Sequence, residues 1–188
     1  MKRLYTFFMA AALCLSSNAA TPINVVNGIS QELAVSRAAI VGNITYDLTF
    51  NIPASKTEAV KGNATITFIY KGGKTDLQLD FQGAPSQFDG LCVVNGKQIA
   101  VAWQDEHILI PRKSLRRGKN VISMSFISGD KSLNRNADYL YTLFVPEHAR
   151  SVFPCFDQPD LKALFRTRLN VPEGWETITS VSTERIPT

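Results

Sequence analysis

The chain has 188 residues, of which 45% are hydrophobic and 19% are charged. This length is typical of a single domain, and this composition excludes disordered, collagen-like and coiled-coil chains. The 20 Lys and Arg exceed the 16 Asp and Glu by too little to indicate a nucleic-acid-binding protein, and no basic stripe with interleaved aromatic residues occurs. Two histidines and three cysteines lie scattered along the chain. Because zinc sites usually need closely spaced ligands, the composition argues against a self-contained metalloenzyme.

The first twenty residues have the three parts of a secretory signal peptide. A basic start at 1–3 is followed by an almost continuous apolar run of about a dozen residues over 4–15, and Ala19 and Ala20 offer small residues for cleavage. A helix needs ~20 apolar residues to cross a bilayer, so this run is too short to be a membrane span. We predict that residues 1–20 are a signal peptide and that the protein is exported, to the periplasm or out of the cell.

The cysteines do not form a dense disulfide framework. Cys14 follows Leu13, whereas bacterial lipoprotein signals favour a small residue before the cysteine, so we do not expect lipidation at Cys14. Cys92 and Cys155 remain in the mature chain, and an oxidising compartment would permit a disulfide between them. Their spacing does not support a particular pairing, and we expect two buried thiols.

One short helix is expected at the start of the mature chain. Ser30 can cap a helix over 31–39, and Gly42 can end it. We therefore assign residues 21–43 to an N-terminal segment with this short helix and residues 44–188 to a β-sandwich domain.

Apolar and polar residues alternate along most of the remaining chain, which indicates strands with one buried face. The dipeptide Asn95-Gly96 favours a tight hairpin between two of these strands. Short strands separated by frequent turns are typical of a sandwich or barrel, and not of a parallel α/β sheet. The sequence thus predicts an all-β sandwich of about nine strands, drawn from segments 44–52, 64–70, 77–81, 91–94, 99–103, 108–110, 121–127, 139–145, 165–171 and 177–181.

The predicted strand at 139–145 is apolar on both faces. A strand of an isolated sandwich normally turns one polar face to water. We therefore expect this strand to be covered once by the core of its own domain and once by a neighbouring domain. One face carries Tyr139, Tyr141, Leu143 and Val145, and the other carries Leu140 and Phe144.

An irregular corner is expected after this strand. Pro154 and Pro159 prevent a regular helix or a central strand there. Asp157 can accept hydrogen bonds from backbone N–H groups and start a turn. Arg150 is placed to hold a carboxylate or backbone carbonyls, so the physics of the segment indicates a sturdy β-corner.

The same stretch resembles a signature near the end of the N-terminal domain of aminopeptidase N-like zinc metallopeptidases. It follows the pattern A-R-x-x-F-P-C-F-D-x-P-x-x-K-A-x-F, with Gln158 where many members have Glu. The resemblance extends over about residues 29–180, essentially the whole mature chain. The matching residues are Ala149, Arg150, Phe153, Pro154, Cys155, Phe156, Asp157, Pro159, Lys162, Ala163 and Phe165.

The resemblance implies an all-β, saddle-shaped N-terminal domain packed on a thermolysin-like catalytic domain. In the family, the catalytic domain binds zinc through H-E-x-x-H and a downstream Glu, and a G-x-M-E-N loop grips the free amine of the peptide. Neither motif occurs here, since His107 precedes Ile108 and His148 precedes Ala149. A catalytic zinc needs three protein ligands and an activated water. No catalytic or metal-binding residue is therefore assigned to this chain, and zinc is expected only in a full-length parent enzyme.

The sequence departs from the family just before Pro146. Family members often read T-Q-x-E or T-Q-x-Q there, and these positions help to bind the substrate amine. The corresponding residues here are Leu143 and Val145, whose side chains have no hydrogen-bond acceptor for an ammonium group. No substrate-binding role is carried over to them.

The favoured interpretation is a non-catalytic N-terminal domain of an exported zinc aminopeptidase, truncated before its catalytic domain. That domain would be its partner, and peptides would reach it only through the parent enzyme. The alternative is a free-standing secreted β-sandwich that binds glycans or proteins, with Trp103 or Trp175 exposed for this purpose. A third interpretation, an independent hydrolase, would have to use Asp157, His148 and Glu147.

Overall fold

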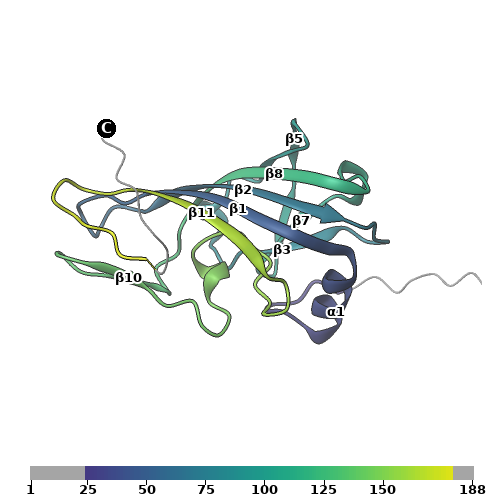
Figure 1. Ribbon diagram of the computed structural model, residues 1–188, viewed down its shortest axis with the longest axis horizontal. Helices are drawn as coiled ribbons and strands as arrows, with labels where there is room; N and C mark the ends of the chain where they lie inside the picture. Colours follow the sequence, from purple (N-terminus) through teal and green to yellow (C-terminus); the bar gives the residue numbers. More distant parts are fainter. Residues whose placement is uncertain (1–23, 180–188) are drawn as a thin grey trace, which may run out of the picture.

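The computed structural model describes residues 24–179, which are drawn in colour in Figure 1. The predicted signal peptide and Cys14 lie outside the described residues. Within the described range, no helix has both the length and the apolar character that crossing a membrane requires. Residues 24–179 form one α-helix, three short 3-10 helices and eleven strands.

The elements follow one another as a helix and then a long series of strands. The helices are α1 (Gln31–Ile40), η1 (Pro85–Gln87), η2 (Arg112–Ser114) and η3 (Ala149–Ser151). The strands are β1 (Val41–Asn51), β2 (Lys61–Tyr70), β3 (Leu77–Asp80), β4 (Leu91–Val94), β5 (Lys97–Ala100), β6 (Ala102–Gln104), β7 (His107–Ile110), β8 (Gly118–Ile127), β9 (Leu133–Arg135), β10 (Leu140–Thr142) and β11 (Ala163–Asn170).

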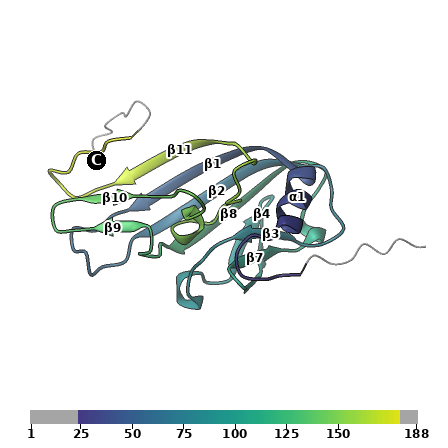
Figure 2. The same cartoon turned by 90° about the horizontal axis from the view of Figure 1, so that it is seen from below.

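The strands form three sheets, as the all-β prediction requires. The main sheet has six strands in the order β11-β1-β2-β8-β4-β5, and smaller sheets are formed by β3-β7-β6 and by β9 with β10. Among the described strands, β1 and β11 pair in parallel and the other pairs are antiparallel. In Figures 1 and 2 the main sheet is a long twisted layer, with α1 at one end and the β9–β10 ribbon near the other.

The core lies between the inner face of the main sheet, the β3-β7-β6 sheet and the corner after η3. The alternation seen in the sequence sets this arrangement, because every second residue of β1, β2 and β8 is buried along most of each strand. Gly62 faces Phe126 across the β2–β8 pair, and the Phe126 ring fills the space that a Cβ at Gly62 would occupy. A glycine is therefore required there by close packing.

The start of the domain differs from its prediction in one detail. Ser30 caps α1 as expected, since its Oγ accepts a hydrogen bond from the Leu33 N–H at 3.1 Å. Gly42 does not end the helix, however: α1 ends at Ile40 and β1 begins directly at Val41. Gly42 lies inside β1 beside a bulge, where Asn43 has a φ of 51°. The helix can pass straight into the strand because the bulge absorbs the irregularity.

The structure has eleven strands where about nine were predicted. The predicted strand 99–103 is divided at Val101 between β5 and β6, which belong to different sheets. The short strand β9 was not predicted, and β10 is only the middle of the predicted strand 139–145. Residues 177–179 are not in a strand, and the rest of predicted strand 177–181 lies outside the described residues. β5, β6 and β9 are only three or four residues long, so alternation cannot show how they pair.

Candidate functional site

The corner over residues 149–160 lies at the centre of the molecule. Phe153, Cys155 and Phe156 are almost fully buried, and Pro154 is buried between them. Cys155 also forms an antiparallel bridge with Asp80 of β3, with backbone bonds of 2.8 and 3.0 Å. The residues that carry the family resemblance thus connect the main sheet to the β3-β7-β6 sheet.

Arg150 holds the corner by binding three acidic side chains. Its guanidinium lies 3.1 Å from a Glu147 carboxylate oxygen, 3.4 Å from Glu106 and 3.7 Å from Asp157. It also donates a hydrogen bond to the Glu147 backbone carbonyl at 2.7 Å. Arg150 therefore contacts three carboxylates and a backbone carbonyl, as its sequence position suggests.

Asp157 is a structural acceptor within this corner. Its Oδ2 accepts a hydrogen bond from the Arg150 backbone N–H at 3.0 Å. Burial raises the pKa of the Asp157 carboxyl above its ordinary value, while the Arg150 N–H and guanidinium act in the opposite direction. Pro159 follows Asp157 by two residues and is exposed, at the end of the corner.

A second charged cluster is completely enclosed beneath the corner. The Asp80 Oδ1 lies 2.6 Å from Arg37 Nη1 of α1 and 2.9 Å from His107 Nδ1 of β7, and all three side chains are at most 1% exposed. Asp80 Oδ2 accepts the Asp157 backbone N–H at 2.8 Å. Burial alone would raise the pKa of Asp80, but the contact with His107 and the charge of Arg37 outweigh it, so the pKa lies below its usual value.

This enclosed cluster ties the N-terminal segment to the sandwich. Arg37 Nε donates to Gln158 Oε1 at 2.6 Å, and Gln158 Nε2 donates back to the Ala34 carbonyl of α1 at 3.0 Å. On the other side, His107 Nε2 lies 3.0 Å from the carbonyl oxygens of Val26 and Gly28. These contacts attach residues 26–40 to the sandwich. The sequence pattern does not predict them.

The carboxylates and the buried histidine described above all have structural partners. Both Glu147 and Asp157, the carboxylates of the hydrolase interpretation, are engaged with Arg150. His107 is enclosed with Asp80 and cannot meet a substrate. Among residues 24–179, no group of three or more His, Cys, Asp or Glu side chains could hold a metal ion. The described residues therefore do not fit the zinc of the metallopeptidases.

An exposed apolar face lies on β10 and the residues beside it. We call the outward-facing side chains of this segment the apolar face; they are Tyr139, Tyr141, Leu143 and Val145, which are 54%, 55%, 60% and 75% exposed. The two tyrosine rings stack with their centroids 6.3 Å apart. Leu140 and Phe144 pack against the core on the opposite side, so the segment divides into the two faces that the sequence predicted.

Aromatic rings continue from this segment to the edge of the main sheet. Phe153 packs edge to face against Phe144 and against Phe165 of β11, at centroid distances of 5.7 and 6.3 Å. Phe165 also stacks on Tyr46 at 4.9 Å, yet it remains 56% exposed. Phe165 is therefore a further exposed aromatic residue, linked to the β10 segment through the buried Phe153 ring.

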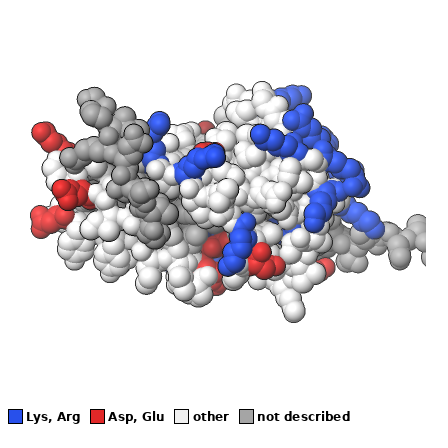
Figure 3. Space-filling view, viewed as in Figure 1, with Lys and Arg blue, Asp and Glu red and all other residues white. Residues whose placement is uncertain are grey.

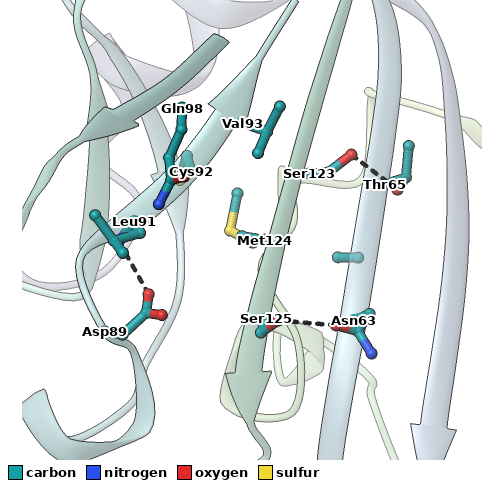
Figure 4. Close-up of a pocket in the computed structure, with 11 residues that line it drawn as sticks. Asn63, Thr65, Asp89, Leu91, Cys92, Val93, Gln98, Ser123, Met124 and Ser125 are labelled. Carbon is teal, nitrogen blue, oxygen red and sulfur yellow. Dashed lines mark hydrogen bonds between the residues drawn. The ribbon is translucent and has the colours of Figure 1, made fainter. Parts of the chain in front are cut away.

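A shallow pocket opens on the main sheet where β4 and β8 diverge (Figure 4). It has a volume of about 400 Å³, and it forms because β4 pairs with β8 only at Val93 and Val94. Thr65 and Ser123 of its lining bond to each other at 2.9 Å. Burial, together with the charge of Asp89, raises the pKa of the lining Cys92 thiol to about 12. Cys92 is therefore not an activated nucleophile.

The remaining candidate residues have structural environments. Cys92 and Cys155 are both free and buried, so they are not joined by a disulfide. Trp103 is only partly exposed, packs against the core and donates its indole N–H to the Phe81 carbonyl at 2.9 Å. It does not form an exposed platform for a glycan. Trp175 is likewise only partly exposed.

Comparison with known proteins agrees with the corner and the fold. A family model described as the peptidase M1 N-terminal domain matches residues 128–185. Aminopeptidase N of Streptomyces lividans is 28% identical over 166 residues, which are 82% of this chain and 19% of that protein. A probable M1 family aminopeptidase of Encephalitozoon cuniculi is 38% identical over 84 residues, 39% of this chain and 9% of its own length. The chain thus spans only a small part of these relatives.

Solved structures share the fold. An M1 zinc metallopeptidase from Deinococcus radiodurans superposes with a TM-score of 0.57 at 19% identity, over 69% of this chain and 32% of that one. Leukotriene A4 hydrolase from Saccharomyces cerevisiae gives a TM-score of 0.53 at 18% identity, over 72% of this chain and 24% of that one. Another matched structure, with a TM-score of 0.55 at 19% identity over 69% of this chain and 32% of that one, is of a two-domain M1 zinc metallopeptidase.

Together these features define a class: an all-β sandwich domain with a structural corner and an exposed apolar face. The sequence and fold comparisons indicate the particular family. Residues 128–185 match the peptidase M1 N-terminal domain, and the chain is similar in sequence and fold to the N-terminal part of M1 aminopeptidases.

Proposed function

We propose that this chain is the non-catalytic N-terminal domain of an exported zinc aminopeptidase and that it packs against the catalytic domain through its apolar face. The catalytic domain would hold the zinc and hydrolyse peptides from their N-terminus. This domain would support one side of the substrate cleft. The relatives and the two-domain matched structure support this role, because in them the present chain corresponds to only part of a larger enzyme.

The observation that carries the proposal is the exposure of the apolar face. Four large apolar side chains, each more than half exposed, lie on one side of a single segment. A group of exposed apolar side chains on a domain often marks an interface with another protein. Burying it would gain roughly 25 cal/mol for each Å² of apolar surface removed from water.

The apolar face also suggests which domain binds the substrate amine. Leu143 and Val145 correspond to family positions that help to bind this amine, yet neither side chain can accept a hydrogen bond. We infer that this chain contributes apolar packing at the cleft, and that the catalytic domain alone recognises the ammonium group of the peptide.

The activity of the purified chain tests whether zinc binding and hydrolysis belong to the catalytic domain alone. Alone, it should contain no stoichiometric zinc and should not release amino acids from aminoacyl reporter substrates. Added to, or joined with, an M1 catalytic domain encoded beside it in the genome, it should form a stable complex with chelator-sensitive activity. One zinc per chain and turnover by the chain alone would overturn the proposal, and so would the lack of any M1 catalytic domain that binds it.

Export is supported only by the pattern of residues 1–20, and it needs a separate test. The mass of the protein recovered from fractionated cells should correspond to cleavage after Ala19 or Ala20. It should be recovered outside the cytoplasm. An intact N-terminus on cytoplasmic protein would show that the export part of the proposal is wrong.

A further inference from the structure

Basic side chains gather at the end of the molecule away from β10. Three turns meet there, at 71–76, 95–96 and 111–119, and together with the first residue of β5 they carry eight exposed basic residues and one acidic residue, Asp76. Figure 3 shows the basic side chains along this end and acidic side chains at the opposite end. We call the eight residues the basic end; they are Lys71, Lys74, Lys97, Arg112, Lys113, Arg116, Arg117 and Lys119.

Hydrogen bonds hold two of these turns together. The Asp76 carboxylate accepts the backbone N–H of Arg112 at 2.9 Å. The Arg117 guanidinium donates to the Lys71 carbonyl and lies beside Gly72, whose φ of 98° favours glycine. The single acidic side chain is therefore used for the backbone of the turn, and it does not neutralise the surrounding charge by forming an ion pair in the described part of the chain.

A buried asparagine fixes the third turn against the second. Asn120 is fully buried; its Oδ1 accepts the Arg116 N–H at 3.0 Å, and its Nδ2 donates to the Arg116 carbonyl at 2.6 Å. Asn95 donates to the same Asn120 oxygen at 2.9 Å and to the Ser114 carbonyl at 3.2 Å. The polar groups of the turns thus face inward and are satisfied, while the cationic side chains point outward.

The basic end concentrates the positive charge of the protein. Within residues 24–179, none of its eight side chains forms an ion pair. The rest of the chain has 12 basic and 15 acidic residues, so it is net acidic. Placing like charges close together on fixed turns destabilises the isolated domain. An anionic partner would remove this repulsion.

We propose that the basic end binds the surface of membranes that contain anionic phospholipids. The charges are spread over three turns at one end of the molecule, which suits a layer of phosphate groups better than a single bound phosphate. The turns contain no aromatic residue on which a nucleic-acid base could stack. Attachment by this end would leave the apolar face, near β10 at the other end in Figure 1, free for a catalytic domain.

Vesicle binding tests this proposal directly. The purified chain should sediment with vesicles of phosphatidylcholine mixed with phosphatidylglycerol, and not with vesicles of phosphatidylcholine alone. High salt should release it, because salt screens these interactions. The variant Lys74→Gln, Lys113→Gln, Lys119→Gln should bind about a hundredfold more weakly, since each basic residue near an anionic surface strengthens binding by roughly fivefold.

A charge-matched control separates the basic end from net charge. Lys56→Gln, Lys61→Gln, Arg168→Gln removes three exposed charges outside the basic end, and it should bind vesicles nearly as well as the unmodified chain. Equal losses in the two triple variants, or equal binding to both kinds of vesicle, would overturn the proposal. Binding to duplex DNA as tight as to anionic vesicles at the same salt concentration would also overturn it, because the site would then be a general polyanion site.

Discussion

Arg150 determines how the corner of this domain is held. It binds Glu147 and Glu106 through its guanidinium, and its own backbone N–H is bound by Asp157. Its side chain is 8% exposed, so these contacts lie mostly out of water. In such a site each polar group must have a partner, because an unpaired buried donor costs about 1–3 kcal/mol.

Replacing Asp157 tests whether its carboxylate supports the corner. Asp157→Ala should lower the free energy of unfolding by about 1–3 kcal/mol, because the Arg150 N–H loses its acceptor. Asp157→Asn should cost less, since an amide oxygen can take the same place. Urea unfolding measures both effects. The exposed Asp138 provides the control, and a change for Asp157→Ala as small as that for Asp138→Ala, within about 0.5 kcal/mol, would contradict this role.

The two buried thiols should be inert in the native protein. Burial raises the pKa of Cys155 well above its usual value, and the pKa of Cys92 is raised to about 12 by burial and then by the charge of Asp89. Because the thiolate is the nucleophile, neither should react with iodoacetamide at neutral pH. Peptide mass analysis should show both residues labelled only after denaturation. Rapid native labelling of Cys92 would show that the pocket opens to the reagent.

At the scale of elements, α1 is joined to the sandwich by a buried ion pair. Arg37 is the only residue of the helix that reaches Asp80 of β3, and Gln158 binds both Arg37 and the helix backbone. A buried pair does not always stabilise a fold relative to apolar residues. Removing one partner is nevertheless costly, because the other charge stays buried without compensation.

Arg37→Met should therefore destabilise the domain strongly. The free energy of unfolding should fall by about 3–5 kcal/mol, the range for breaking a buried pair. Arg166→Met gives the matched control, because Arg166 and Asp47 form an ion pair whose side chains are 73% and 43% exposed. That variant should change stability by less than about 1 kcal/mol. Similar losses in the two variants would show that Asp80 is not left unpaired when Arg37 is removed.

The elements that the sequence predicts well are those with long alternating patterns. β1, β2 and β8 lie where the alternation places them, since a buried face over many residues fixes the register of a strand. The division of 99–103 at Val101 could not be predicted in this way. Both pieces keep an extended backbone, and only their partners in two different sheets distinguish them.

The candidate site was predictable only in part. The corner carries a recognisable local motif, and the two faces of 139–145 follow from their alternation. The Arg37, Asp80 and His107 cluster gives no such signal. In β3, Gln78 and Asp80 alternate with Leu77 and Leu79. This alternation predicts one solvent-exposed face, yet all four residues are buried. Local patterns cannot show that a second layer covers the polar face.

At the scale of the whole molecule, two surfaces of different chemistry lie apart. The basic end is formed by the turns near α1, and the apolar face lies beside β10 toward the other end (Figures 1 and 3). A domain that packs by one surface and is attached by the other can do both at once. This separation makes the two proposals independent, because a variant of either surface leaves the other unchanged.

The apolar face gives the last prediction, which concerns how the isolated chain behaves in solution. With no partner to cover Leu143 and Val145, the chain should self-associate or bind a hydrophobic reporter dye, since neighbouring exposed apolar side chains favour association. Leu143→Lys and Val145→Lys should each suppress association and dye binding without unfolding the domain, because the core-facing Phe144 is untouched. Val35→Lys, at a 65% exposed residue of α1, should leave dye binding unchanged. Light scattering and dye fluorescence report the association, and circular dichroism reports the fold. A strictly monomeric chain that binds no dye, or the unfolding of either lysine variant, would show that this face is not an interface with another domain.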